Sequence, residues 1–140
     1  KWKGSIMVDF DLLYAEAWRV VQPRKLSDSA ESCGVGAAIL TQDGKIYCGV
    51  CIDTACSMGF CAEHAAAAAM ITAGENKIAA VIAVGWDGKI MPPCGRCREF
   101  LSQLADENAD AQVKVNETTV VRLSELLPFN WQSKPEGKMT

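Results

Sequence analysis

Cys61-Ala62-Glu63 and, further along the chain, Pro93-Cys94-Gly95-Arg96-Cys97 are the two segments around which the rest of the sequence can be arranged. Together they supply three cysteines and a glutamate. Zinc with three protein ligands keeps its fourth tetrahedral position for water, which distinguishes a catalytic site from a closed structural one. A neighbouring carboxylate that does not bind the metal can transfer the protons of that water. We therefore predict that Cys61, Cys94 and Cys97 hold Zn²⁺ and that Glu63 transfers protons.

Both segments are expected to begin helices. The free N–H groups and the dipole at a helix N-terminus favour negative charge, so a thiol placed there ionises more easily. Glu63 follows Cys61 by two residues, so its carboxylate lies on the same first turn of the helix. From this position it can reach water on the metal without binding the metal itself.

Three thiolates on one Zn²⁺ leave a net charge of about −1, which weakens the ion as a Lewis acid. A cationic or hydrogen-bonding group is therefore expected beside the sulfur atoms. Arg96 lies inside the Cys-x-x-Cys turn and is the first candidate for this charge compensation, with His64 and Arg98 behind it.

Composition limits the class of protein. The chain has 140 residues, of which 49% are hydrophobic, and this is enough for one compact domain, which we expect to span residues 7–140. Residues 1–6 show no pattern and are interpreted as a cloning remnant. The formal net charge of −3 argues against an extended surface for nucleic acid or anionic membranes. We expect a small-molecule partner, no membrane span, no secretory signal and a cytoplasmic location.

The seven cysteines do not indicate a disulfide scaffold. Seven is an odd number, and the chain has enough apolar residues to fold without cross-links. In a reducing compartment, a Cys-x-x-Cys pair plus a third cysteine indicates a metal site. The other four are expected to be free thiols: Cys33, Cys48, Cys51 and Cys56.

Hydrophobic spacing predicts alternating helices and strands. Helices are expected from residue 8 to Pro23, over 61–73 with Gly74 as the C-terminal stop, and over 95–104. The polar stretch 24–32 and the stretch 85–93 are predicted loops. Five strands are expected over 35–41, 45–52, 79–84, 112–115 and 118–121, the first two joined by the hairpin signal Asp43-Gly44. A short helical turn over 123–127 ends at Pro128. This order predicts a three-layer α/β/α domain with one mixed five-stranded sheet.

The chain resembles the zinc-dependent cytidine deaminases, a group that also includes blasticidin-S deaminase. The resemblance runs from about Leu12 to Pro128. Its matching segments are Gly34-Val35-Gly36-Ala37-Ala38, Asp43-Gly44-Lys45-Ile46-Tyr47, Cys61-Ala62-Glu63, Pro93-Cys94-Gly95-Arg96-Cys97-Arg98-Glu99 and Glu125-Leu126-Leu127-Pro128. The zinc motif is the most specific of these segments.

This resemblance implies a cytidine deaminase-like fold and a hydrolase that converts cytidine or deoxycytidine to uridine or deoxyuridine plus ammonia. It implies Zn²⁺ held by Cys61, Cys94 and Cys97, with Glu63 protonating first the ring nitrogen and then the departing ammonia. It also implies that the backbone N–H of Ala62 holds the ring carbonyl. The expected assembly is a homotetramer.

The sequence departs from the family where the sugar is held. Relatives usually carry Asn-x-Glu on the second strand, and this chain has Cys51-Ile52-Asp53. Asp53 can accept a hydrogen bond from a hydroxyl group, whereas Cys51 cannot replace an amide. We keep Cys51 and Asp53 as substrate-binding candidates. Trp131, in a late loop, is a further candidate, and Trp86 is another loop tryptophan that could stack on a substrate or simply pack.

Other functions remain open at this stage. One is deamination of a modified cytosine nucleoside such as blasticidin S, or of another aminated heterocycle. A second, from another class, is a non-catalytic protein with a structural zinc site and a surface Glu63. A redox-active Cys94 and Cys97 pair is disfavoured by its Pro-Pro entry and its Cys-Ala-Glu partner segment. Nucleic-acid deamination is disfavoured because the loop tryptophans Trp86 and Trp131 have no basic neighbours in the sequence.

Overall fold

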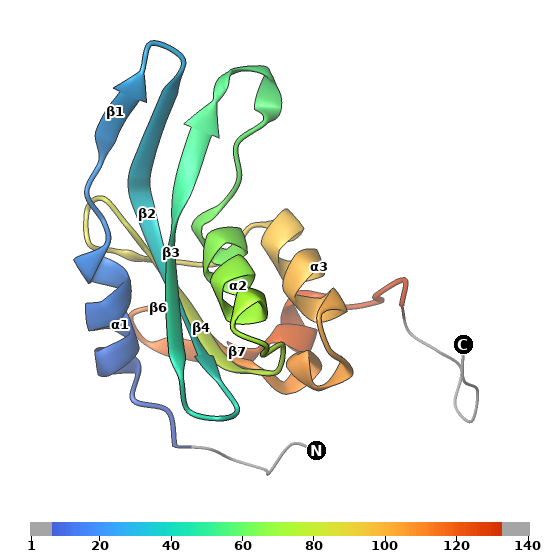
Figure 1. The fold of residues 1–140 in the computed structure, drawn as a ribbon. Coiled ribbons are helices and arrows are strands. Elements are labelled where there is room, and N and C mark those ends of the chain that lie inside the picture. The colour runs from blue at the N-terminus through green and yellow to red at the C-terminus, as the bar shows by residue number, and fades with distance from the viewer. Residues whose placement is uncertain (1–6, 133–140) are drawn as a thin grey trace.

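The structure, a computed structural model, describes residues 7–132. The predicted cloning remnant and the last eight residues of the predicted domain lie outside this range. Figure 1 shows the course of the chain. The elements, in order, are α1 (Phe10–Arg19), β1 (Arg24–Ser27), β2 (Ala30–Thr41), β3 (Ile46–Thr54), a 3-10 turn (Ala55–Ser57), α2 (Ala62–Thr72), β4 (Ile78–Gly85), β5 (Ile90–Met91), α3 (Gly95–Gln103), a second 3-10 turn (Asp106–Asp110), β6 (Gln112–Asn116), β7 (Thr119–Arg122) and a third (Leu123–Leu126).

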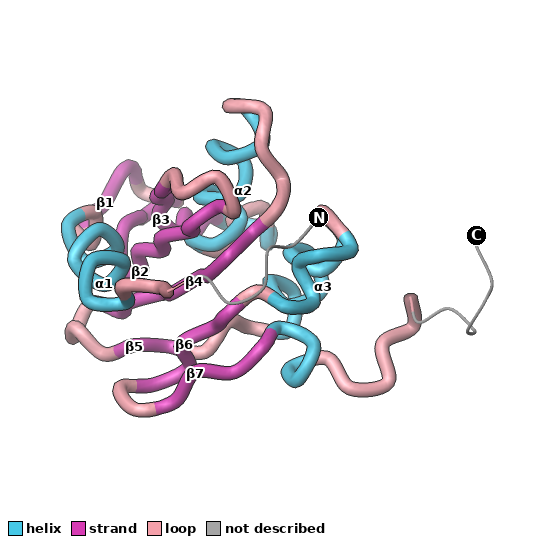
Figure 2. The backbone as a smooth tube through the Cα atoms, turned by 90° about the horizontal axis from the view of Figure 1, so that it is seen from below, coloured by secondary structure: helices cyan, strands magenta, loops and turns pink. Residues whose placement is uncertain are grey.

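The helices cover both faces of one sheet. α1 lies on one face, and α2 and α3 lie on the other, as Figure 2 shows most clearly. Two sets of buried side chains fill the spaces between the layers. Leu13 and Ala17 of α1 pack with Ile82 of β4, and Met70 of α2 packs with Leu101 of α3 and Val113 of β6. The predicted three-layer α/β/α arrangement is therefore confirmed. No helix of the described residues is long and apolar enough to cross a membrane.

The sheet is mixed and has seven strands, two more than expected. The main path runs β1-β2-β4-β6-β7, with β3 paired to β2 and β5 paired to β4. β4 and β6 are parallel and the other pairs are antiparallel. The five predicted strands are β2, β3, β4, β6 and β7.

The two extra strands correct the predicted loops. The stretch 24–32 forms β1 and the start of β2, and the stretch 85–93 contains β5. All four residues of β1 are exposed and β5 has only two residues, so neither strand has an alternating apolar pattern. Both are held by backbone pairing to a longer strand, which residue pattern does not reveal.

Local sequence signals place the other elements well. The Asp43-Gly44 hairpin is present, with the N–H of Thr41 donating to the carbonyl of Lys45 (2.8 Å) and Gly44 at φ +87°. All eight residues of β4 are buried, as expected for a strand covered on both faces. Gly74 follows α2 with φ +95°, as a helix-ending glycine does. These elements bring the starts of α2 and α3 together beside β3 and β4 (Figure 1).

Candidate active site

Three thiols meet where α2 and α3 begin. Cys61 and Cys94 are the N-cap residues of these helices, and Cys97 lies in the first turn of α3. The Sγ of Cys94 lies 3.5 Å from the Sγ of Cys61 and 3.5 Å from that of Cys97, and Cys61 and Cys97 lie within 4.8 Å of each other. Zn–S bonds of about 2.3 Å at tetrahedral angles place sulfur atoms about 3.8 Å apart. The donor set and its spacing therefore fit zinc.

His64 is the nearest nitrogen donor to these thiols. Its Nδ1 lies 3.4 Å from the Sγ of Cys97, and together with Cys61 it completes a group of three that could hold a metal ion. The imidazole stacks on Phe100, with ring centroids 4.1 Å apart and an angle of 15°. Burial lowers the pKa of His64, and the charge of Arg96 lowers it further. The imidazole is thus held in contact with Cys97 in surroundings that favour its neutral form.

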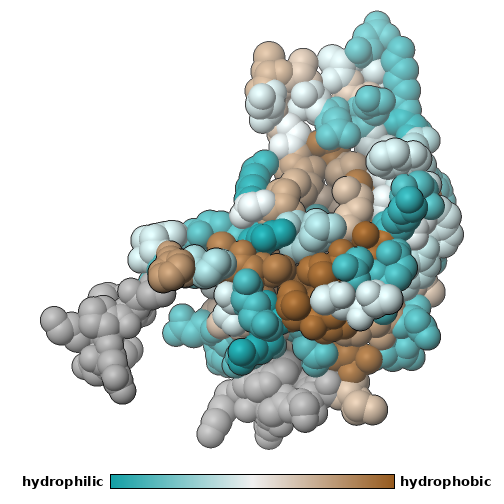
Figure 3. Space-filling view, turned by 180° about the vertical axis from the view of Figure 1, so that it is seen from behind, coloured by the Kyte–Doolittle hydropathy of each residue, from teal (hydrophilic) through white to brown (hydrophobic). Residues whose placement is uncertain are grey.

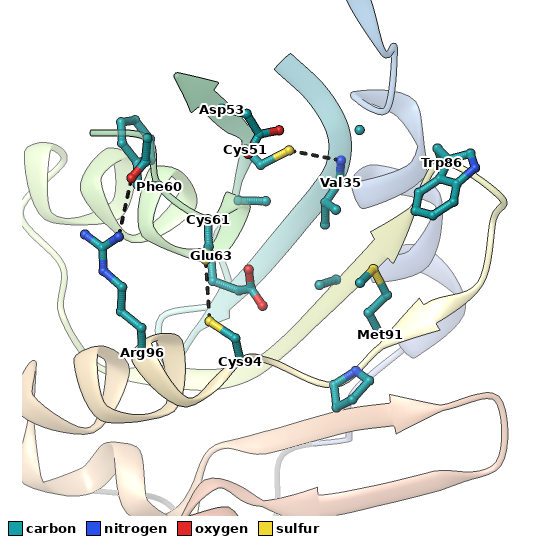
Figure 4. Close-up of a pocket in the computed structure, with 15 residues that line it drawn as sticks. Val35, Cys51, Asp53, Phe60, Cys61, Glu63, Trp86, Met91, Cys94 and Arg96 are labelled. Atoms are coloured by element: carbon teal, nitrogen blue, oxygen red, sulfur yellow. Dashed lines mark hydrogen bonds between the residues drawn. The ribbon is translucent and has the colours of Figure 1, made fainter. Parts of the chain in front are cut away.

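Glu63 lies in the first turn of α2 with only 4% of its surface exposed. Figure 4 shows its carboxylate directed into the cavity beside Cys61 and Cys94. Burial raises the pKa of Glu63, although its own backbone N–H and the Cys97 thiol oppose the shift. A raised pKa brings a carboxyl group closer to the pH at which an enzyme works, which favours its use in general acid–base catalysis.

Burial also acts on the three thiols. It raises the pKa of Cys97, which the neighbouring Glu63 raises further, and it raises the pKa of Cys61. At Cys94, burial is outweighed by the backbone N–H of Cys97 and by the other two thiols, so the pKa of Cys94 is lowered. Metal binding to such a cluster must displace protons from the thiols, of which that of Cys97 is on a buried residue.

A cavity of about 460 Å³ opens in front of the thiols. Its lining includes seven residues predicted for the site: Cys51, Asp53, Cys61, Ala62, Glu63, Cys94 and Arg96. Cys97 is fully buried and does not line the cavity. The remaining lining is largely apolar or aromatic, with Val35, Phe60, Trp86 and Met91 among the largest side chains (Figure 4).

Cys51 and Asp53 point from the same face of β3 into this cavity. The backbone N–H of Val35 donates to the Sγ of Cys51 (3.3 Å), so this sulfur atom is engaged by the neighbouring strand. Asp53 is exposed, and its side chain forms no hydrogen bond or ion pair among the described residues. Asp53 is therefore the acceptor that a ligand can reach on this side.

The two arginines near the thiols bind backbone carbonyls. Nη1 of Arg96 donates to the carbonyl of Gly59 (3.4 Å), and Arg98 donates to the carbonyls of Pro93 (2.8 Å) and Leu126 (3.4 Å). Over residues 7–132, neither forms a hydrogen bond with a thiol. Charge compensation by Arg96 stays a prediction, and His64 is the group in contact with sulfur.

Trp131 does not join the cavity within one chain. Its side chain is 75% exposed, and its Nε1 donates to Glu99 Oε2 (3.0 Å). The structure instead places Trp86, Phe60, Met91 and Val35 in the lining. Sequence reasoning had no signal for Phe60, Met91 or Val35 beyond their nearness to the motifs. For Trp86, the signal was its place directly after a buried strand.

Comparison with known proteins places this chain among enzymes of one kind. Residues 14–110 match the family described as "Cytidine and deoxycytidylate deaminase zinc-binding region". A cytidine deaminase of Halalkalibacterium halodurans is 35% identical over 67% of this chain and 74% of its own length. One from Mycobacterium tuberculosis is 35% identical over 48% of this chain and 51% of its own length.

Solved structures agree with these matches. The crystal structure of cytidine deaminase from Mycobacterium tuberculosis has a TM-score of 0.75 at 27% identity, covering 89% of this chain and 98% of that one. The corresponding structure from Mycobacterium leprae has a TM-score of 0.74 at 26% identity, covering 87% of this chain and 99% of that one.

Proposed function

The chain belongs to the family of zinc-binding cytidine and deoxycytidylate deaminases, and from this premise we propose that its cavity hydrolyses a cytidine-type nucleoside to the uridine-type product and ammonia. The observation that carries the proposal is the buried Glu63 carboxylate, which faces the same cavity as the Cys61 and Cys94 thiols. A carboxylate that only happened to lie near a structural metal would be expected on the surface, in water, and not buried. The zinc-dependent deaminase is therefore favoured over a non-catalytic zinc protein.

The residues of this chain divide the chemical work. Cys61, Cys94 and Cys97 would hold the zinc ion, which when bound would supply a Lewis acid that makes a water molecule more acidic. Glu63, whose pKa is raised by burial, takes a proton from water and passes it to the ring nitrogen of the substrate. The remaining hydroxide would add to the amine-bearing carbon of the ring, and Glu63 then moves the proton of this hydroxyl group to the amine, which leaves as ammonia. One carboxylate thus serves in two steps because it remains close to both the water and the ring.

Ala62 holds the ring in place. It is the first residue of α2, and the first N–H groups of a helix have no partner within the helix. Its N–H, at the cavity wall, is suited to donate to the carbonyl oxygen of the pyrimidine. This contact fixes which ring atom faces Glu63.

The sugar end of the cavity is less polar than the family pattern. Because Cys51 already accepts the N–H of Val35, Asp53 is the side chain that can bind a hydroxyl group there. We propose cytidine and deoxycytidine as substrates, with Asp53 accepting a hydroxyl hydrogen bond. The second candidate is a modified cytosine nucleoside such as blasticidin S, or another aminated heterocycle, because Cys51-Ile52-Asp53 stands where the family carries its ribose-holding Asn-x-Glu pair.

An ammonia-release screen tests both candidates. The substrates are cytidine, deoxycytidine, cytosine, blasticidin S, aminated purines and aminated pterins, each added to the zinc-loaded protein. We expect ammonia from the cytidine-type nucleosides. A protein that holds zinc and releases ammonia from none of them would support the structural-zinc alternative. In that case a His64→Ala variant with reduced zinc content would identify His64 as a fourth ligand that closes the site.

Glu63→Gln is the matched test of the mechanism. The amide fills the same space but cannot exchange protons, so we expect one zinc per chain, as in the unchanged protein, and a fall in kcat/KM of about 10²-fold or more. Zinc is measured by elemental analysis and turnover by ammonia release. Turnover close to that of the unchanged protein would contradict the role given to Glu63.

We also propose a homotetramer in the cytoplasm. Apart from Glu63, His64 and Thr72, α2 consists of Ala, Met and Ile, and its exposed positions include Ala68, Ala69 and Ile71. A surface helix is normally polar on its outer side. Seen from behind, further apolar side chains gather across the middle of the molecule (Figure 3). Other copies of the chain would bury the exposed apolar side of α2. The seven unpaired cysteines are compatible with a reducing compartment such as the cytoplasm.

A further inference from the structure

Trp86 gives the cavity an aromatic side chain that has no role in the proton transfers of the proposed reaction. It lies in the turn between β4 and β5 and lines the same cavity as Glu63, yet 67% of its surface is exposed. Figure 4 shows it at the opposite end of the cavity from Arg96. A ligand that covers a large apolar ring exposed to water at a cavity mouth lowers the free energy of the system.

The backbone that carries this ring is fixed before any ligand binds. The N–H of Gly85 donates to the carbonyl of Lys89 (2.9 Å), and the N–H of Gly88 donates to that of Gly85 (2.9 Å). The hydroxyl of Tyr14 on α1 donates to the carbonyl of Gly88 (2.6 Å), which ties the turn to a helix on the other face of the sheet. A ligand that contacts Trp86 therefore does not have to order the loop.

The other described tryptophans differ from Trp86. Trp131 is exposed, but its Nε1 is bonded to Glu99 and it does not line the cavity. Trp18 lies on α1, beside the turn at Gly88, and does not line the cavity either. Among residues 7–132, only Trp86 brings an indole to the cavity.

We infer that Trp86 is a substrate-positioning residue whose indole stacks on the bound nucleoside at the cavity mouth, while the amine-bearing end of the ring reaches Glu63. This inference rests on the proposed function. Stacking is suited to this substrate because every nucleobase presents a flat π face, and base–aromatic stacking contributes substantially to binding. Trp86 is exposed at the cavity mouth whereas Glu63, which transfers the protons, is buried, so the contribution of Trp86 belongs to binding more than to the chemical step.

Kinetics of two variants test this inference. Trp86→Ala removes the stacking face, and we expect KM for cytidine to rise about tenfold or more with kcat changed by about threefold at most. Trp86→Phe keeps an aromatic face, so its KM is expected to lie between the two. Zinc content and Tm of both variants should match the unchanged protein, because the ring is exposed. A KM for Trp86→Ala within about twofold of the unchanged value overturns the inference.

Fluorescence gives a readout that needs no turnover. Uridine, the reaction product, is added to the zinc-loaded protein, and we expect it to quench tryptophan emission in the unchanged protein but not in Trp86→Phe. Trp131→Phe is the matched control and should keep the quenching. Quenching that persists in Trp86→Phe and vanishes in Trp131→Phe overturns the inference.

The two proposals fail in different ways. If the protein releases no ammonia from any substrate, the proposed function fails. If ammonia is released but KM and quenching ignore Trp86, only the positioning role fails.

Discussion

Asn108 links three parts of the chain through one buried amide. Its side chain is 0% exposed; Oδ1 accepts the N–H of Ile78 (2.8 Å), and Nδ2 donates to the carbonyls of Asn76 (3.1 Å) and Leu101 (3.0 Å). These bonds hold the start of β4, the loop before it and the end of α3. Because α3 carries two of the thiols, the amide supports the site without touching it.

Replacing Asn108 should therefore destabilise the fold. Asn108→Ala removes the acceptor of the buried Ile78 N–H and the donor to the carbonyls of Asn76 and Leu101, of which Leu101 keeps the N–H of Leu104 (3.3 Å). We expect a loss of about 2–4 kcal/mol in the free energy of unfolding. Urea denaturation of the zinc-loaded protein measures it. The control is Asn116→Ala, an exposed asparagine whose Oδ1 accepts the N–H of Thr118, and its expected cost is below about 1 kcal/mol. Equal losses in both variants would contradict the argument.

Tyr47 and Glu75 give the stability a dependence on pH. The hydroxyls of Thr41 and Tyr47 lower the pKa of Glu75, and the Tyr47 hydroxyl lies 2.6 Å from its Oε2. A carboxyl group with a lowered folded-state pKa stabilises the fold above its unfolded pKa, and this stabilisation is lost as the pH falls through the folded-state value. Tyr47→Phe should therefore be less stable than the unchanged protein at pH 7, with the difference shrinking below the ordinary carboxyl pKa of 4.5. Thermal unfolding of both proteins at pH 7 and at a pH below 4.5 measures this difference in stability. A difference that grows on acidification would refute the prediction.

At the residue scale, the sequence predicts what short-range spacing determines. Cys61 and Glu63 share one helical turn, and Cys94 and Cys97 share another, so their mutual positions follow from helix geometry. The cavity lining does not follow in this way. Trp86 reaches the cavity because β4, the strand that precedes it, pairs with β2, which lies much earlier in the chain. The indole of Trp131 instead donates a hydrogen bond to Glu99 on α3. The contact of His64 with Cys97 likewise joins two helices and has no signal in sequence spacing.

Two glycines set how closely the helices approach the sheet. A Cβ at Gly49 of β3 would overlap the backbone nitrogen of Ala66 in α2, and one at Gly36 of β2 would overlap the carbonyl of Ala17 in α1. Both obstacles are backbone atoms, so neither can move aside alone. α2 therefore lies against β3 at a distance that only glycine permits, and the position of Cys61 and Glu63 depends on it.

Gly49→Ala should accordingly displace α2. We expect a loss of about 1–3 kcal/mol or more in unfolding free energy and reduced zinc affinity, because the helix that carries Cys61 must shift. Denaturant unfolding and a zinc-competition titration measure the two effects. The control is Gly34→Ala, whose added Cβ meets nothing within 4 Å and whose stability should change little. A stable Gly49→Ala with unchanged zinc affinity would show that the contact is not limiting.

At the element scale, elements with a recognisable residue pattern were predicted, including the short β6 and β7, whereas β1 and β5, which have none, were not. β4 is apolar throughout, and α2 is alanine-rich and is followed by Gly74, so the residue composition alone identifies both elements. β1 is exposed and exists because β2 extends beyond the body of the sheet and offers it an edge (Figure 1). Such pairing is a property of the partner strand, which a local reading of residues 24–27 cannot contain.

On the scale of the whole molecule, the layers leave one helix incompletely covered. α1 exposes Leu12 and Trp18 but intersperses them with the charged Asp11, Glu16 and Arg19, whereas the exposed positions of α2 carry alanines, Ile71 and Thr72 and no charge. An apolar outer face lowers solubility unless another protein surface covers it. The proposed homotetramer would provide this cover with further copies of α2, next to the helix that carries Cys61.

Ala69→Glu tests that assembly. A carboxylate on the exposed side of α2 would be buried against a neighbouring copy without a partner, so we expect the tetramer to dissociate and its mass by sedimentation equilibrium to fall. The matched control is Leu12→Glu, which adds the same charge at an exposed apolar position of α1, on the opposite face of the sheet, and should keep the larger mass. Since Ala69 does not line the cavity, a dissociated variant also tells whether one chain deaminates alone. An unchanged protein that sediments as a monomer with full turnover would overturn the tetramer, and an Ala69→Glu variant that keeps its mass would place the interface elsewhere.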